Sequence, residues 1–143
     1  MLTVVPVCVL MLALTTLIHY EALSWLARRL PALPLRSRFK VVVVLGGAFV
    51  AHVVEIALYA LAFLLLVHLG AGSLAGEPTL AFDNALYFSG ETFTSLGYGD
   101  LVPGGALRLL ASTETLNGLL LIGWSASYTY IAMERFWSRP GQE

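Results

Sequence analysis

The chain has 143 residues, of which 58% are hydrophobic and 12% are charged, and its mean hydropathy is +0.81. Soluble domains carry about 25% charged residues, so this composition excludes an ordinary water-soluble domain and predicts lipid around much of the chain. A single cysteine, Cys8, excludes a disulfide framework and a Cys/His zinc site, and its apolar neighbours predict a small buried side chain.

The first apolar segment covers residues 1–27, is most apolar through Ile18, and then carries His19 and Glu21. A helix rises about 1.5 Å per residue and the hydrocarbon core of a bilayer is about 30 Å thick, so this segment is long enough to span. It lacks the basic start and the small-residue cleavage site of a signal peptide. We therefore expect an N-terminal transmembrane helix that is retained.

A basic linker at residues 28–40 follows, in which Pro31 and Pro34 interrupt the helix. It holds five of the eight Lys and Arg residues. Arg135 and Arg139 lie at the other end of the chain, near a short tail at 138–143. The positive-inside rule therefore predicts that the linker and the C-terminus are cytoplasmic and that the N-terminus is outside.

The second apolar segment, residues 41–69, carries His52 and Glu55, which are three residues apart and share one helix face. Ionisable side chains at membrane depth are costly and are functional candidates. Three interpretations stay open for this pair: a proton sensor, a contact with the first helix, or a polar pair that fixes helix packing.

Residues 70–106 contain no Lys, Arg or His but four acids, Glu77, Asp83, Glu91 and Asp100, so this outer segment is expected to concentrate cations. A short apolar stretch at 82–94, with Asp83 as its expected cap, is too short to span and predicts a re-entrant helix. Irregular backbone is expected after it, which at membrane depth must be buried in protein or line a water-filled path.

The sequence S-L-G-Y-G-D at residues 95–100 stands where that irregular backbone is expected, and a third apolar segment follows at 107–137. Gly97 and Gly99 permit alternating backbone angles that aim successive carbonyl groups in one direction. Rings of such carbonyls replace the water around a potassium ion, and four copies of the loop are needed for a ring. The Thr94 and Ser95 hydroxyls precede the loop, and that of Ser95 would complete the lowest ion site.

Residues 85–100, A-L-Y-F-S-G-E-T-F-T-S-L-G-Y-G-D, resemble the pore helix and selectivity filter of tetrameric potassium channels, and most resemble the small bacterial pore-only channels, including the proton-gated one. The resemblance implies an all-α membrane protein with three transmembrane helices, a re-entrant pore helix and a filter loop, assembled as a homotetramer. The pore domain would cover 41–137, with outer helix 41–69, pore helix 82–94, filter 95–100 and inner helix 107–137. Ser95 and Leu96 replace the first two residues of the usual T-V-G-Y-G.

The resemblance also assigns roles to individual residues. The filter would comprise Thr94, Ser95, Leu96, Gly97, Tyr98, Gly99 and Asp100, with K⁺ held by the carbonyls of the second to fifth of these. The Tyr98 ring is expected to pack on the pore helix near Tyr87. Glu91 would lie behind the filter, where it either shares a proton with Asp100 and braces the loop or only caps its hydrogen bonds.

Two residues of the third segment have open interpretations. Gly118 matches the inner-helix glycine that serves as a gating hinge in this family, and it equally fits a helix-packing site. Glu114 is expected to be a buried, hydrogen-bonded side chain, with an ion-binding role as the alternative.

The function expected from these features is passive K⁺ conduction in a membrane, with a bacterial inner membrane as the expected location. Neither an enzymatic activity nor a cofactor is expected, K⁺ is the permeant ligand, and the expected partners are further copies of the chain and membrane lipids, without nucleic acid. Two alternatives stay open: a weakly selective K⁺/Na⁺ channel, and a non-conducting partner of another channel or sensor.

Overall fold

The computed structural model describes residues 3–76 and 81–137, and within them the fold is mostly helical. The elements in chain order are α1 (Val4–Arg29), the 3₁₀ turn η1 (Leu30–Ala32), α2 (Ser37–His68), β1 (Gly72–Ala75), α3 (Phe82–Phe93), β2 (Val102–Gly105) and α4 (Leu107–Trp137). Glu77, the tail at 138–143 and the roles predicted for them lie outside the described residues.

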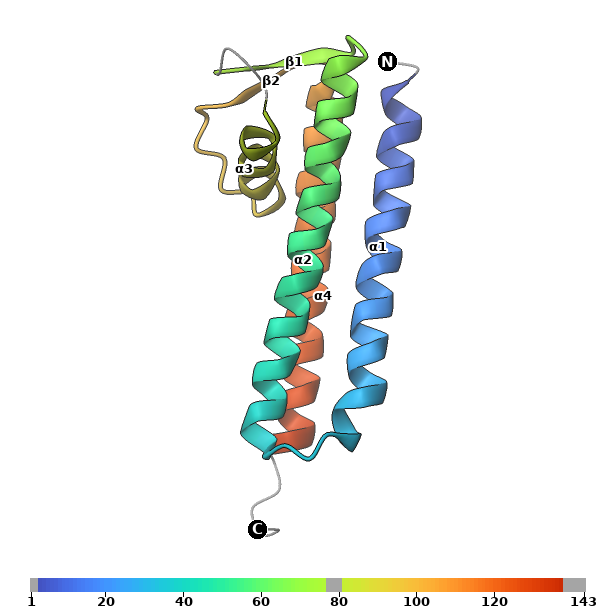
Figure 1. Ribbon diagram of the computed structural model, residues 1–143, viewed down its shortest axis with the longest axis vertical. Coiled ribbons are helices and arrows are strands. Elements are labelled where there is room, and N and C mark those ends of the chain that lie inside the picture. The colour runs from blue at the N-terminus through green and yellow to red at the C-terminus, as the bar shows by residue number, and fades with distance from the viewer. Residues whose placement is uncertain (1–2, 77–80, 138–143) are drawn as a thin grey trace.

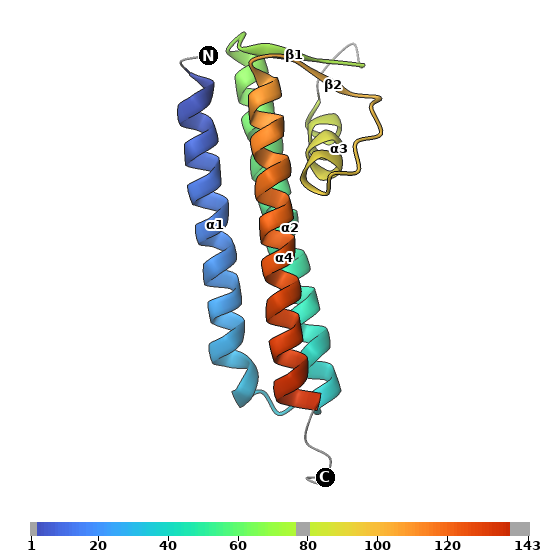
Figure 2. The same ribbon diagram turned by 180° about the vertical axis from the view of Figure 1, so that it is seen from behind.

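Three long helices, α1, α2 and α4, lie side by side with their axes roughly aligned (Figures 1 and 2). α1 packs against both α2 and α4. Its N-terminus lies at the same end as the strands and α3, whereas the α1–α2 linker and the end of α4 lie at the opposite end. This arrangement matches the predicted order of crossings.

The helix ends differ from the predicted boundaries by a few residues. α1 continues to Arg29, two residues past the expected end, because Arg28 and Arg29 in its last turn interact favourably with the carbonyl end of the helix. α2 begins at Ser37 rather than at 41, since Pro34 is the last residue that blocks the helix.

A two-stranded antiparallel sheet, which the sequence interpretation missed, closes the segment between α2 and α4. The register runs from Gly72 opposite Gly105 to Ala75 opposite Val102. At Gly72 a Cβ atom would collide with the backbone carbonyl of Gly104, so the strand pair needs glycine there. Because β1 precedes α3 and β2 follows it, the chain leaves this end of the bundle and returns to it, as the re-entrant prediction requires.

One apolar core joins all four α-helices, and α1 contributes Val4, Cys8 and Met11 to it. Cys8 is therefore the buried apolar side chain that was predicted. The edge-to-face pair of Phe63 and Phe88, with ring centroids 5.0 Å apart, attaches α3 to α2.

The outer surface is unusually apolar, as expected of a membrane protein. Among the described residues, Val4–Ala32 and Ser37–His68 are long and apolar enough to cross a bilayer, with mean hydropathies of 1.8 and 2.3. α4 is as long but carries polar residues along its whole length, and it does not reach the same apolarity. Large apolar side chains such as Phe49, Leu116 and Leu120 are more than 60% exposed on the single chain, and so need lipid or another subunit as cover.

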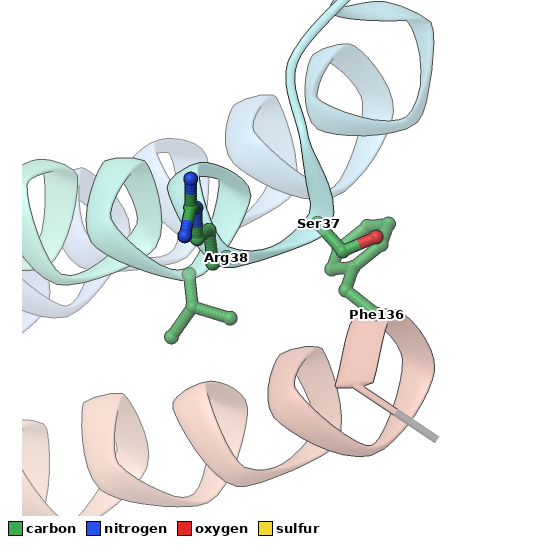
Figure 3. Close-up of a pocket in the computed structure, with 4 residues that line it drawn as sticks. Ser37, Arg38 and Phe136 are labelled. Carbon is green, nitrogen blue, oxygen red and sulfur yellow. The ribbon is translucent and has the colours of Figure 1, made fainter. Parts of the chain in front are cut away.

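The end of the bundle opposite α3 is basic. A small cleft there is lined by Ser37, Arg38, Val41 and Phe136, and Figure 3 shows Ser37 beside the Phe136 ring, where the start of α2 meets the end of α4. The Lys40 ammonium lies 5.2 Å from the centre of that ring. These basic residues, with the Lys40 ammonium over the Phe136 ring, fit the side predicted to be cytoplasmic.

Candidate functional site

α3 lies at one end of the bundle against α2 and α4, and its C-terminus points toward the middle of the bundle (Figure 1). Its N-cap is Ala81, without a side-chain cap bond, so the predicted capping role of Asp83 is wrong. Asp83 lies inside the first turn instead, where its carboxylate favours the positive helix end. The C-terminal end of α3 carries the opposite partial charge, which favours cations near Thr94.

The chain reverses direction directly after α3 through backbone hydrogen bonds to the last turn of the helix. The Ser95 amide donates to the Thr92 carbonyl at 3.1 Å, and the Leu96 amide donates to the Glu91 carbonyl at 2.8 Å. The loop that follows runs back toward β2 (Figure 2). Residues 94–100 are all exposed on the single chain.

Left-handed residues occur at every second position of this loop. The φ angles are +61° at Ser95, +55° at Gly97 and +83° at Gly99. Ser95 is the only non-glycine residue with a positive φ among residues 3–76 and 81–137. Alternation of hand turns successive carbonyl groups toward the same side, which an ordinary strand does not do, since its carbonyls alternate. The left-handed backbone expected at Gly97 and Gly99 is therefore present, and it extends to Ser95.

Glu91 lies behind the loop and holds it at Tyr98. Its side chain is buried, and its Oε2 accepts a hydrogen bond from the Tyr98 backbone amide at 3.0 Å. The Tyr98 ring stacks on Tyr87 of α3, with centroids 6.5 Å apart and planes 2° from parallel. The structure thus brings together Tyr87, Glu91 and Tyr98 as predicted.

Asp100 has its own partners. Its Oδ1 accepts a hydrogen bond from the Leu101 amide at 3.0 Å. No hydrogen bond joins Glu91 to Asp100 within the described part of the chain, so a proton shared between them stays a prediction.

α4 supports the loop from the side. A cavity of about 460 Å³ lies between the loop and α4, with Glu91, Gly97 and Thr115 in its lining. The Thr115 hydroxyl lies 3.2 Å from the carbonyl of Thr92 at the end of α3. Gly118 is buried, and a Cβ atom there would collide with the carbonyl oxygen of Phe93. This contact supports the packing interpretation of Gly118, and α4 is a continuous helix through it.

Glu114 is fully buried and faces α3, as expected of a hydrogen-bonded site. Its Oε1 makes a short hydrogen bond with the Ser89 hydroxyl, which also donates to the Ile56 carbonyl at 2.8 Å. Because a hydroxyl group has a single hydrogen, Ser89 can serve both contacts at once when Glu114 is protonated and donates to it. The other oxygen of Glu114 has no partner among the described residues.

His52 and Glu55 meet as their spacing predicted, and two further residues join them. Glu55 also contacts His19 of α1, and Ser125 of α4 contacts both histidines. Sequence interpretation missed the roles of His19 and Ser125. The signal for His19 was its isolated position in an apolar segment, whereas Ser125 gave none.

A second polar contact joins α1 to the other helices and was not predicted. The Asn117 amide of α4 donates to the Thr15 hydroxyl at 2.6 Å and to the Tyr59 hydroxyl at 3.1 Å. α1 is therefore bonded through polar groups at two levels of the bundle.

Comparison with known proteins gives a consistent result. A family model described as "Ion channel" matches residues 41–135. The chain is 41% identical over 69 residues to two-pore potassium channel 1 of Arabidopsis thaliana, covering 48% of this chain and 19% of that protein. It is 43% identical over 53 residues to the uncharacterized membrane protein YdjJ of Bacillus subtilis (strain 168), covering 36% of this chain and 15% of that protein.

A third relative is protein LctB of Geobacillus stearothermophilus, 41% identical over 49 residues, which cover 34% of this chain and 37% of that protein. The chain thus spans less than two fifths of the length of each of these relatives. The likeness concerns a region of each protein rather than the whole.

Proposed function

The chain belongs to the ion channel family, in which its residues 41–135 form a potassium channel pore region, and we propose that it is one subunit of a homotetrameric channel that conducts K⁺ passively. One loop cannot surround an ion, whereas four loops related by a central axis form rings of carbonyl oxygens. Four identical subunits with closed symmetry supply these rings.

The alternating hand of the 95–100 loop is the observation that carries this proposal. The carbonyls of Ser95, Leu96, Gly97 and Tyr98 would hold K⁺ in place of its hydration water, and the Ser95 hydroxyl would complete the lowest site. The full filter extends from Thr94 to Asp100. The exposure of this loop on the single chain is what a surface that faces a central axis requires.

Glu91 and Tyr87 would support the filter from behind. The bond from Glu91 to the Tyr98 amide fixes the backbone at the centre of the loop. The Tyr98 ring stacks on Tyr87 of α3, and this contact would keep the side chain away from the ion path. Both contacts favour an open ring over a collapsed loop.

Three transmembrane helices, α1, α2 and α4, fit this function, with α3 as the re-entrant pore helix. A helix that lines a water-filled cavity needs a polar face, which accounts for the lower apolarity of α4. The basic linker and the end of α4 would be cytoplasmic, and the acidic filter end would be outside. For Gly118 to serve as a gating hinge, its contact with Phe93 must be released, so a hinge there would be coupled to the base of the filter.

The proposal is tested by recording the purified full-length protein in planar bilayers under opposed K⁺ and Na⁺ solutions at several pH values. A reversal potential near that of K⁺ is expected, and a reversal potential near zero would instead favour the weakly selective channel. Gly97→Ala is expected to abolish the current, because alanine disfavours the left-handed backbone there. Gly46→Ala in α2 is the matched control, since a Cβ atom at Gly46 meets open space. Absence of any current with correctly folded tetramers would contradict conduction and favour a non-conducting partner.

A further inference from the structure

Four polar side chains from three helices meet inside the bundle, away from the filter loop. Glu55 Oε1 lies 2.9 Å from His19 Nδ1, and Glu55 Oε2 lies 3.0 Å from His52 Nδ1. Ser125 Oγ lies 3.1 Å from His52 Nε2 and 3.2 Å from His19 Nε2. These four contacts form a closed ring, called the histidine ring below, in which each histidine nitrogen and each carboxylate oxygen is used once.

The number of hydrogens in the histidine ring follows from its geometry. Four contacts need four hydrogens, one between each pair of neighbouring atoms. Ser125 supplies one, so three must be shared by Glu55, His19 and His52. A carboxylate with two neutral histidines supplies only two. The ring therefore closes when it holds one additional proton, wherever that proton lies along it.

The same count makes the ring electrically neutral. With three hydrogens shared by Glu55, His19 and His52, the ring contains either one imidazolium, one imidazole and a carboxylate, or two imidazoles and a carboxylic acid. Neutrality matters because His19 and Glu55 are 0% exposed and a net buried charge is costly. The two imidazole rings are also stacked 5.0 Å apart, and two imidazolium ions would repel at that distance.

Among the described residues, the surroundings of the ring supply no other charge to replace this proton. Aromatic rings flank it, with Trp124 of α4 5.4 Å from His19 and Phe93 of α3 5.6 Å from His52. The other buried titratable groups of the packed helices have partners of their own: Tyr59 of α2 bonds to Asn117, Glu114 of α4 bonds to Ser89, and Glu91 of α3 accepts from the Tyr98 amide. Cys8 of α1 lies in the apolar core.

We propose that His19, His52, Glu55 and Ser125 form a buried one-proton site that fastens α1 and α4 to α2. Removal of the proton leaves one of the four contacts without a hydrogen, so that two lone pairs face each other and the ring carries a buried negative charge. Ser125 follows Gly118 by seven residues, or about two turns, on α4. Loss of the proton therefore weakens the hold of the ring on the part of α4 beyond the filter contact, and this consequence for gating rests on the proposed function.

Two histidines and a glutamate are also a possible set of metal ligands. The imidazole planes of His19 and His52 are only 29° from parallel, however, so the lone pairs that lie in these planes do not converge on one point. Each carboxylate oxygen is already bonded to a different histidine. This geometry favours a proton over a metal ion as the ligand.

The decisive variant is Glu55→Gln, because the glutamine amide supplies the missing hydrogen. Its NH₂ group donates to one histidine while its oxygen accepts from the other, so the ring closes with two neutral imidazoles and without the additional proton. Glu55→Ala opens the ring instead. Ser127→Ala is the matched control on α4, since within the described residues the Ser127 hydroxyl bonds to its own helix, at the Gly123 carbonyl.

Thermal unfolding of the full-length protein in detergent, measured over a range of pH, tests the site without any need for current. The wild type and Ser127→Ala are expected to lose thermal stability as the pH rises and the ring loses its proton. Glu55→Gln is expected to stay as stable as the wild type at neutral pH and to lack that decline, whereas Glu55→Ala melts lower at every pH. A Glu55→Gln protein that keeps the decline, or that melts as low as Glu55→Ala, would overturn the proposal.

The proton itself is observed by solid-state NMR of protein labelled with ¹⁵N-histidine, reconstituted in liposomes and carrying His68→Asn, so that only His19 and His52 are seen. Both signals should change together in a single step that Glu55→Gln abolishes. Two independent steps would contradict the proposal of one shared proton. Thermal stabilisation of the protein by zinc chloride that requires both histidines would contradict it as well. Bilayer recordings of the same variants then test the consequence for gating, and their failure leaves the NMR result intact.

Discussion

Glu91 is the residue on which the conformation of the exposed loop depends most directly. Its buried carboxylate accepts a hydrogen bond from the Tyr98 amide at the centre of the loop. The backbone of the same loop is strained at Ser95, a non-glycine residue in the left-handed region. A hydrogen bond to a charged acceptor contributes about 1.5–3 kcal/mol. A single side chain is therefore strong enough to decide between two conformations of the loop.

Replacing Glu91 by alanine should release the Tyr98 amide. We expect its hydrogen exchange to become about 10- to 100-fold faster in Glu91→Ala, because a loss of about 1.5–3 kcal/mol corresponds to that factor. Glu91→Gln keeps a neutral acceptor and should show an intermediate rate. Hydrogen–deuterium exchange measures both, and current recordings should show altered inactivation or open probability. Unchanged exchange and gating in both variants would refute the bracing role.

Glu114 offers a second test at the residue scale, because its role is inferred from counting hydrogens. Glu114→Gln places an amide donor against the Ser89 hydroxyl and should unfold within about 1 kcal/mol of the wild type. Glu114→Ala loses the bond and leaves a cavity, and should be about 2–4 kcal/mol less stable. Chemical unfolding in detergent measures the difference. If Glu114 were ionised and bound an ion, Glu114→Gln would instead alter conduction.

Among the elements, α3 and α4 are joined at one point of very close approach. Gly118 places the α4 backbone against the last carbonyls of α3, immediately before the chain reverses into the loop. Any side chain there must push α3, and with it the loop, away from α4. The position of the loop is thus fixed by the absence of a side chain on α4 as well as by Glu91 behind it.

Gly118→Ala should therefore destabilise the protein by about 1–3 kcal/mol through overpacking, although alanine is the better helix former. Gly123→Ala is its control on the same helix, since a Cβ atom there meets open space, and should be neutral or stabilising by up to about 1 kcal/mol. Thermal unfolding followed by circular dichroism compares the two. Equal melting temperatures would show that α4 does not need the close contact.

At the scale of the whole molecule, α1 is an integral part of the bundle rather than a loose attachment. It contributes to the common core and is bonded to α2 and α4 through Thr15 and His19. Its N-terminus lies at the end of the bundle that holds α3, β1 and β2, and the basic linker lies at the other end (Figure 1). A whole-molecule prediction follows for the orientation in the membrane.

Single cysteines in a Cys8→Ser background test this orientation. Ala75→Cys, on the exposed side of β1, should react with a membrane-impermeant maleimide in intact cells, whereas Arg36→Cys in the linker should react only after the cells are opened. Both positions are exposed in the structure, so a lack of access cannot be due to burial in the chain. The reverse labelling pattern would contradict the positive-inside assignment.

The sequence by itself determined the features that depend on local pattern. Apolar runs predicted the long helices, the length of 82–94 predicted a re-entrant helix, and Gly97 and Gly99 predicted a loop with left-handed residues. The resemblance of residues 85–100 to channel filters agrees with the family match over residues 41–135. These features could be predicted because each depends on residues close together in the chain.

Only the tertiary structure decided the contacts between distant residues. His19 and Ser125 are 106 positions apart, and Thr15 and Asn117 are 102 apart, so no local pattern could pair them. The same holds for β1 with β2, and for Gly118 against Phe93, where helix packing fixes the role of a glycine that the sequence left open between hinge and contact. Periodicity shows which face of a helix is buried, but the partner on that face depends on how the helices are rotated and offset when they pack.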